Sequence, residues 1–189
     1  MKPALPIIEA EHRTLGKLLR GLKTATDDLV AGRQSSDVGL LGAIVRYIGA
    51  YPERYHHPKE TRHLFNRLRM RTTELDIVLD RLERDHLVGE AMLSGLSSAL
   101  RATENGGDNE RKAFARNVNH FAEFYWEHMR IEEELILPAA RRLFTEDDWD
   151  DLNCAFAGHF DPLAETTERT GNAEFAALLA RLDTDAVAR

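Results

Sequence analysis

Apolar side chains recur at three- and four-residue steps along four long stretches of the chain, with polar residues between them. Residues three and four apart share one face of an α-helix, so this spacing predicts four amphipathic helices. The apolar stripes run from Ile8 to Leu29, Leu41 to Leu68, Leu75 to Leu100 and Phe114 to Leu143. Apolar and polar residues do not alternate at period two, so we expect no β-sheet.

Short polar segments separate the predicted helices, and helices joined by short connections pack as antiparallel neighbours. We therefore predict an all-α, up-down-up-down four-helix bundle over residues 1–143. Beyond it, a capping box at Thr145–Asp148 and apolar spacing at Phe175–Leu182 predict short helices. Residues 144–189 are then a C-terminal helical extension packed on the bundle, with a dimer contact as the alternative.

One polar pattern repeats on three of these apolar stripes: a histidine with a glutamate four residues later. The first stripe adds a lone histidine. A four-residue separation places both side chains on one helix face, one turn apart. Ionised carboxylates are costly to bury without a partner, and a metal ion is the usual partner for this mixture. The predicted metal ligands are His12, His56, Glu60, His86, Glu90, His128 and Glu132.

The four histidines also match in height along the predicted bundle. Each consecutive pair lies at nearly equal distances from the turn that joins its two helices. With a rise of about 1.5 Å per residue, these offsets place all four within roughly 3 Å of a common level. A buried histidine bonded to a helical neighbour would explain one pair, but three converging pairs favour a metal site. Glu90, beside Gly89, has a solvated position as its alternative.

The second predicted helix contains two prolines, Pro52 and Pro58, each of which removes a backbone hydrogen bond. Such a cost beside a metal site suggests a kink that opens space for an exogenous ligand. The alternative is a helix broken in two. The kink leaves either His56 or His57 as the inward-pointing residue, and we prefer His56 because it repeats the spacing found twice elsewhere.

Composition excludes several classes of function. The 189 residues carry a net charge of −7, which argues against nucleic acid as a partner. We find no apolar run long enough to span a membrane, and the polar N-terminus lacks a signal-peptide core, so a cytoplasmic location is expected. Cys154 is the single cysteine, so a disulfide within the chain and a thiolate metal cluster are both excluded.

At these residues the chain resembles the hemerythrin-like family, also called the HHE cation-binding domains, over roughly residues 8–143. The matching elements are Glu11-His12, Tyr55–Glu60 leading to Leu64-Phe65, Asp85-His86, and His128–Glu133 leading to Leu137-Pro138. The resemblance implies two Fe ions in an oxo- or hydroxo-bridged di-iron centre. It assigns Glu60 and Glu132 as bridging carboxylates and the four histidines of the predicted ligand set as terminal ligands.

The oxygen-carrying members of that family place a second histidine where this chain has Glu90. An anionic ligand there would stabilise the ferric state, which argues against reversible oxygen carriage. We therefore expect a non-haem di-iron protein that senses or reacts with dioxygen, peroxide or nitric oxide, whether or not it is an enzyme. The alternatives are an iron-homeostasis or regulatory metal-responsive module without catalysis, and a structural bundle holding zinc or manganese. We expect a monomer or homodimer.

Overall fold

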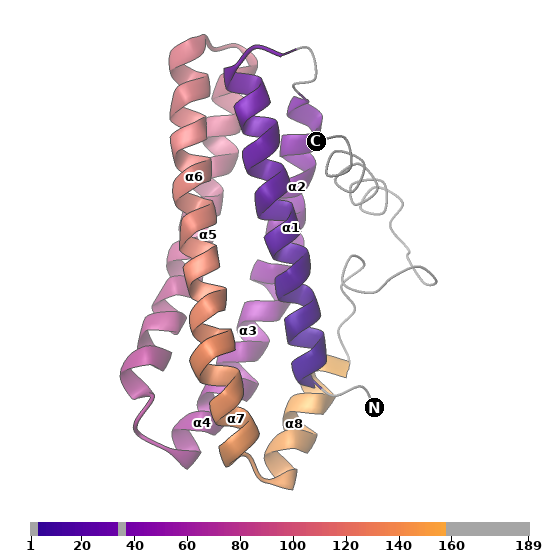
Figure 1. Cartoon of the computed structure of the whole chain (residues 1–189), viewed down its shortest axis with the longest axis vertical. Helices are drawn as coiled ribbons and strands as arrows, with labels where there is room; N and C mark the ends of the chain where they lie inside the picture. The colour runs from indigo at the N-terminus through magenta and orange to yellow at the C-terminus, as the bar shows by residue number, and fades with distance from the viewer. Residues whose placement is uncertain (1–3, 34–36, 158–189) are drawn as a thin grey trace.

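A computed structural model of the chain describes residues 4–33 and 37–157, which form helices and contain no strand (Figure 1). Four antiparallel rods form a closed ring, because α1 and α5 each contact both α2 and α6. The first and third rods are α1 (Ala4–Val30) and α5 (Asp76–Glu104). The second is α2 (Val38–Ala50), η1 (Pro52–His56), α3 (His57–Lys59), η2 (Glu60–Phe65) and α4 (Asn66–Arg71). The fourth is α6 (Asp108–Ile131), η3 (Glu132–Ile136) and α7 (Leu137–Leu143). The predicted all-α bundle is confirmed.

The second and fourth rods contain π-helical segments, η1, η2 and η3, in which backbone N–H groups reach back five residues. The N–H of His57 bonds the carbonyl of Pro52, and the N–H of Leu137 bonds that of Glu132. Such wide turns are rare and are found mostly at functional sites. The two prolines therefore disturb the second rod as predicted, through π-helical turns that follow an irregular residue at Tyr51 (φ −121°, ψ −67°).

The π-helical segment η3 also changes which residues of the fourth rod face the core. The apolar stripe predicted Leu135 inside, yet this side chain is 47% exposed and Ile136 is fully buried. A wide turn holds more residues than an α-helical turn, so the inward face moves along the sequence. Periodicity at 3.6 residues cannot anticipate such a shift.

The hydrophobic core is divided into two parts along the bundle. One cluster lies toward the α1–α2 turn and includes Leu15, Ile48, Leu93 and Tyr125. The other lies toward α4 and includes Ile8, Leu64, Leu82 and Ile131. In each rod, the predicted histidine falls between a residue of the first cluster and one of the second. The histidines therefore share one level, as the sequence offsets predicted.

A further helix, α8 (Glu146–Ala157), closes the end of the bundle against α1 and η2. Its predicted capping box is formed, because the backbone N–H of Thr145 donates to Asp148 Oδ2 at 2.9 Å. At its other end, the Phe156 ring lies 6.2 Å from the ring of His56. This helix thus covers one side of the polar layer. The predicted final helix at Phe175–Leu182 lies outside the described residues.

The buried carboxylate of Asp148 fastens α8 to α4. Arg71 donates to its two oxygens at 2.7 and 3.0 Å, in a bidentate pair. This hydrogen bonding outweighs burial and holds the pKa of Asp148 well below its ordinary value. A carboxyl group whose pKa is lowered by folding stabilises the fold above its unfolded pKa, near 3.9, and loses that contribution as the pH falls below it.

Replacing Asp148 with Asn keeps an acceptor for the Thr145 cap but removes the charge that Arg71 neutralises. Because Arg71 is partly exposed, we expect a loss of about 1–3 kcal/mol, less than for a fully buried pair. The melting temperature at neutral pH should fall by several degrees, and the difference from the parent should shrink below about pH 4. Asp147→Asn, an exposed change in the same helix, is the control. Equal melting temperatures for both variants would contradict this role.

Candidate metal centre

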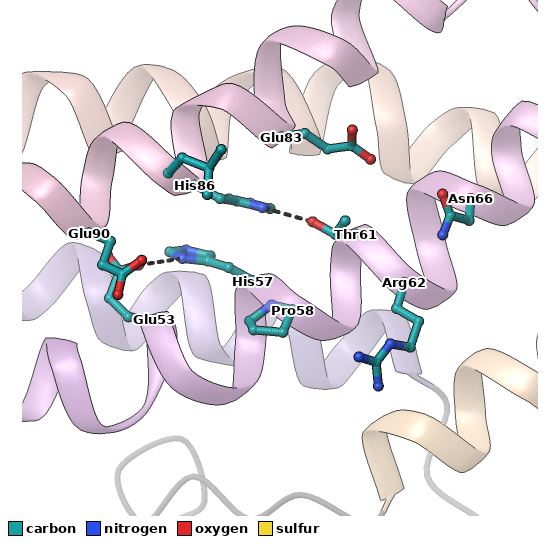
Figure 2. Close-up of a pocket in the computed structure, with 10 residues that line it drawn as sticks. Glu53, His57, Pro58, Thr61, Arg62, Asn66, Glu83, His86 and Glu90 are labelled. Atoms are coloured by element: carbon teal, nitrogen blue, oxygen red, sulfur yellow. Dashed lines mark hydrogen bonds and ion pairs between the residues drawn. The ribbon is translucent and has the colours of Figure 1, made fainter.

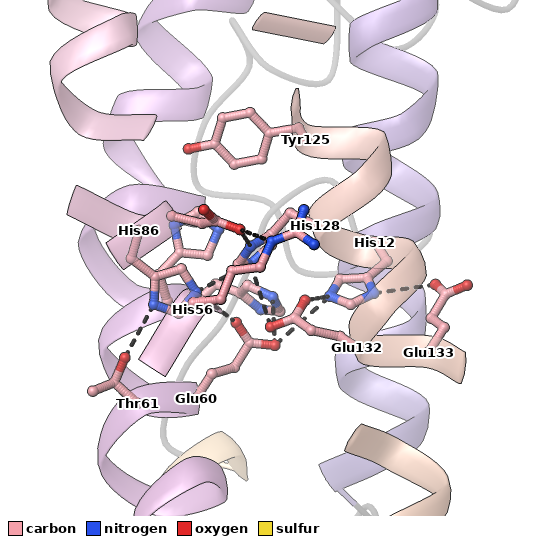
Figure 3. Close-up of polar contacts among 12 residues, drawn as sticks. His12, His56, Glu60, Thr61, His86, Tyr125, His128, Glu132 and Glu133 are labelled. Atoms are coloured by element: carbon pink, nitrogen blue, oxygen red, sulfur yellow. Dashed lines mark hydrogen bonds and ion pairs between the residues drawn. The ribbon is translucent and has the colours of Figure 1, made fainter. Parts of the chain in front are cut away.

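Two groups of possible metal ligands meet in the polar layer between the apolar clusters. His12, His56 and Glu60 form one group, and within each group the ligand atoms lie within 4.8 Å of one another. Glu60 also belongs to the second group, whose other members are His57, His86 and His128. Figure 3 shows these side chains converging from all four rods. The arrangement therefore offers two neighbouring positions that share a carboxylate.

Glu132 is a second carboxylate shared between the two positions. Its oxygens lie 3.4 Å from Nε2 of His12 and 3.3 Å from Nε2 of His128. Glu60 and Glu132 are both fully buried, and each opens a π-helical segment. A pair of such carboxylates can bridge two cations.

The carboxylate oxygens at the centre of the cluster lack hydrogen bonds within the described part of the chain. Among the described residues, both oxygens of Glu60, both of Glu132 and Nε2 of His12 are buried without a hydrogen-bond partner. Imidazole nitrogens lie 3.1–3.7 Å away but point into the same space. Buried unpaired polar atoms cost free energy, and cations among these lone pairs would remove the cost. The donors present therefore fit metal ions.

Four of the five imidazoles have an oxygen within hydrogen-bond distance of the outer nitrogen, Nδ1. This is the arrangement that fixes the tautomer and orientation of metal-ligating histidines. The pairs are His12–Glu133 (3.1 Å), His56–Glu11 (2.6 Å), His57–Glu53 (3.2 Å) and His86–Thr61 (3.0 Å). Nδ1 of His128 lies 3.7 Å from Asp85 and makes no hydrogen bond among the described residues. With Nδ1 held outward, Nε2 is left to face the cluster.

Two rings of the second group, those of His57 and His86, form a parallel stack. His57 lies on His86 with ring centroids 4.4 Å apart and planes 12° apart. Tyr125 covers the other face of His57 at 5.7 Å, and Phe65 covers the other face of His86 at 5.6 Å. Both imidazoles are therefore held between aromatic rings, which restricts their rotation.

Burial sets the charge of the stacked pair. It lowers the pKa of His57 well below its ordinary value, and positive charge on His56 and His128 lowers it further. Burial likewise lowers the pKa of His86, to about 2. These two imidazoles are therefore neutral at pH 7, and a metal can bind them without displacing a proton. Burial also raises the pKa of Glu53, to about 7, against the opposing hydrogen bond from Tyr125.

The structure brings together six of the seven predicted ligands and leaves Glu90 apart. Glu90 is exposed and lies in neither ligand group. In the second ligand group, the third imidazole beside His86 and His128 comes from His57, on the neighbouring rod. The donor at this place is therefore the neutral imidazole of His57 and not a carboxylate. The expectation that an anionic Glu90 ligand disfavours reversible oxygen carriage does not apply to this set of ligands.

From the sequence alone, His57 is only the alternative to His56, and Glu53 is missed, because the pattern that predicts the ligands is a histidine followed by a glutamate. Glu53 and His57 have the same four-residue spacing in the reverse order. The choice between His56 and His57 assumed that one helix face turns inward, whereas both side chains are buried beside η1. Glu133 is a further residue that the pattern did not identify as part of the site: its side chain is half exposed, and it bonds His12.

Two pockets reach the cluster from the surface. One, of about 490 Å³, lies between α5 and the second rod and is lined by His57, His86 and Pro58, with Glu90 at its wall (Figure 2). The other, of about 380 Å³, lies between α1 and the fourth rod and reaches His12. The space that the prolines predicted is therefore present on the side of His57.

The fold and the two ligand groups define a helical-bundle metal protein, and the comparison with protein families agrees. The family model described as hemerythrin HHE cation binding domain matches residues 4–140. The chain belongs to this family, so it is a cation-binding protein. A comparison with curated proteins gives no match. In the described part of the chain, no helix is long and apolar enough to cross a membrane.

The variants His57→Ala and Glu90→Ala test which of these two residues is a metal ligand: Glu90, as the sequence predicted, or His57, as the structure indicates. We expect His57→Ala to lower the bound metal toward one ion per chain, because it removes a donor from the second group. Glu90→Ala should keep the metal content of the parent. Elemental analysis after equilibration with ferrous iron and gel filtration measures both. Loss of metal in Glu90→Ala, with full retention in His57→Ala, would contradict the assignment from the structure.

Proposed function

We propose that the protein holds two iron ions in this cluster and uses them to sense or react with dioxygen, peroxide or nitric oxide. The observation that carries the proposal is the pair of fully buried carboxylates, Glu60 and Glu132, each in contact with imidazoles of both positions. The family assignment supports cation binding. The number of donors, their chemistry and the size of the two pockets support the identity of the metal and of its small ligand.

The number of donors supports two ions rather than one. Five imidazole nitrogens and as many as four carboxylate oxygens surround the cluster. One ion with roughly six positions could not use them all. Two ions that share both carboxylates could, and would retain free positions for water or a small exogenous molecule.

The chemistry of the donors supports iron. Imidazole together with carboxylate suits iron, whereas soft metals favour thiolates. Cys154, the single cysteine, lies exposed on α8. When bound, two irons would supply reversible electron transfer and a binding position for a small oxidant. The residues of the chain would hold the imidazoles in one tautomer and keep water from entering through the two ends of the layer, which the apolar clusters close.

The two pockets support a small ligand. Each ends at an imidazole of the cluster and is large enough for a diatomic molecule or peroxide. Glu60 and Glu132 themselves are fully buried, so a larger substrate would not reach them without movement of the rods. We therefore favour dioxygen, peroxide or nitric oxide as ligands.

Protein purified in air after iron-replete expression should contain about two irons per chain and absorb in the near-ultraviolet through ligand-to-metal charge transfer. Reduction should bleach this band, and peroxide or dioxygen should restore it. Glu132→Ala should lose most of the iron, because it removes a shared carboxylate. Elemental analysis and absorption spectra test both statements. A colourless parent without iron would rule the proposal out, and zinc or manganese in its place would indicate a structural bundle.

A second candidate function is an iron-homeostasis or regulatory module without catalysis. It is favoured by the position of the cluster, which divides the core of the bundle into two. Without a metal, the carboxylates of this layer have only the imidazoles as partners among the described residues, and a bound cation would add to the stability of the fold, so occupancy and stability are linked. Iron that shows no spectral response to oxidants, combined with a large fall in melting temperature on chelation, would favour this function over the first.

A further inference from the structure

The position of His57 depends on a group of residues outside the ligand set. Glu53 accepts the Nδ1–H of His57 at 3.2 Å through one oxygen. Its other oxygen accepts the hydroxyl of Tyr125, which comes from the fourth rod. Glu53 therefore joins a residue of the second rod to one of the fourth, and Figure 2 shows Glu53 and His57 in the lining of the larger pocket.

The third rod makes room for this contact at Gly89. A Cβ atom added to Gly89 would overlap the hydroxyl oxygen of Tyr125 and lie 2.9 Å from the adjoining ring carbon. Tyr125 is 1% exposed, and a buried hydroxyl needs a hydrogen-bond partner. Glycine at this position lets the phenol lie flat against His57 while its hydroxyl reaches Glu53.

We propose that Gly89, Tyr125 and Glu53 act as a clamp that positions His57, so that two adjacent histidines serve two different metal positions. The proposal rests on the two-metal centre above and deepens it. Glu53 and Tyr125 are positioning residues, because neither belongs to the ligand groups. They hold the Nδ1–H tautomer of His57, which leaves the Nε2 lone pair for the metal.

The clamp accounts for an arrangement that helix geometry alone does not give. Neighbouring residues of an α-helix point about 100° apart, so His56 and His57 would not both face one centre without further constraint. Glu11 bonds Nδ1 of His56 from the first rod, while Glu53, on the same rod as the two histidines, bonds Nδ1 of His57. The two imidazoles are thus pulled to separate positions.

Glu53→Gln tests the clamp because an amide has a single acceptor oxygen. If that oxygen accepts the buried hydroxyl of Tyr125, the NH₂ group faces His57 and favours the Nε2–H tautomer, which cannot bind a metal through Nε2. Adding Tyr125→Phe should restore binding in part, because the amide oxygen is then free to turn to His57. Gly89→Ala should act like Glu53→Gln without changing a polar group, since its Cβ displaces the phenol.

The experiment titrates metal-free protein with cobalt(II) at pH 8 and follows the two binding steps by their visible spectra. For Glu53→Gln we expect one of the two steps to weaken about 10–100-fold and the other to stay unchanged. Gly89→Ala should resemble it, and the double variant with Tyr125→Phe should bind more tightly than Glu53→Gln alone. Glu90→Gln, in the same pocket but without a histidine contact, is the matched control.

Nitrogen-15 spectra of the imidazoles in the metal-free protein provide a second readout that needs no bound metal. The clamp predicts the Nδ1–H tautomer for His57 in the parent and a mixture of tautomers in Glu53→Gln. Parent-like affinities and tautomers in Glu53→Gln and Gly89→Ala would overturn the clamp, as would equal weakening of both steps. A parent that binds one cobalt or none, with the tautomers as predicted, would instead count against the two-metal centre alone.

Discussion

The charge of two buried carboxylates is the constraint on which the rest of this structure depends. Glu60 and Glu132 lie in the middle of a helical bundle, fully removed from water, with their oxygens unpaired among the described residues. Such groups are tolerated when cations compensate them. The surrounding imidazoles, their outer oxygen partners and the division of the core into two apolar clusters are all consistent with that requirement.

Much of this arrangement could be predicted from the sequence, because helix periodicity and turn positions are local signals. The common level of the histidines followed from the rise per residue, and the capping box of α8 from its four residues. The π-helical turns were not predictable, because they depend on packing. A proline inside a helix can also lead to a kink, a break or a wide turn, and the sequence does not say which. They account for the exposure of Leu135 and for the burial of His57 beside His56.

Glu90 was predicted as a metal ligand from its spacing, but the structure places it outside both groups of possible ligands. Its spacing from His86 repeats that of the two shared carboxylates from their histidines, but its side chain lies exposed in a pocket. The imidazole of His57 occupies the inner wall instead, held by Glu53. With His57 in place of Glu90, the proposed ligand set carries one negative charge fewer than the sequence suggested. Whether the proposed centre would carry oxygen reversibly or react with it therefore depends on whether His57 or Glu90 is the ligand.

The most direct test of this account is a crystal structure of the iron-loaded protein, with anomalous scattering recorded at the iron edge. We predict two anomalous peaks roughly 3.5–4 Å apart, as in other two-metal sites. Each should contact an oxygen of Glu60 and of Glu132, with Nε2 of His57 bound to the peak that His86 and His128 share. A single peak, or a second peak held by Glu90 in place of His57, would contradict the account.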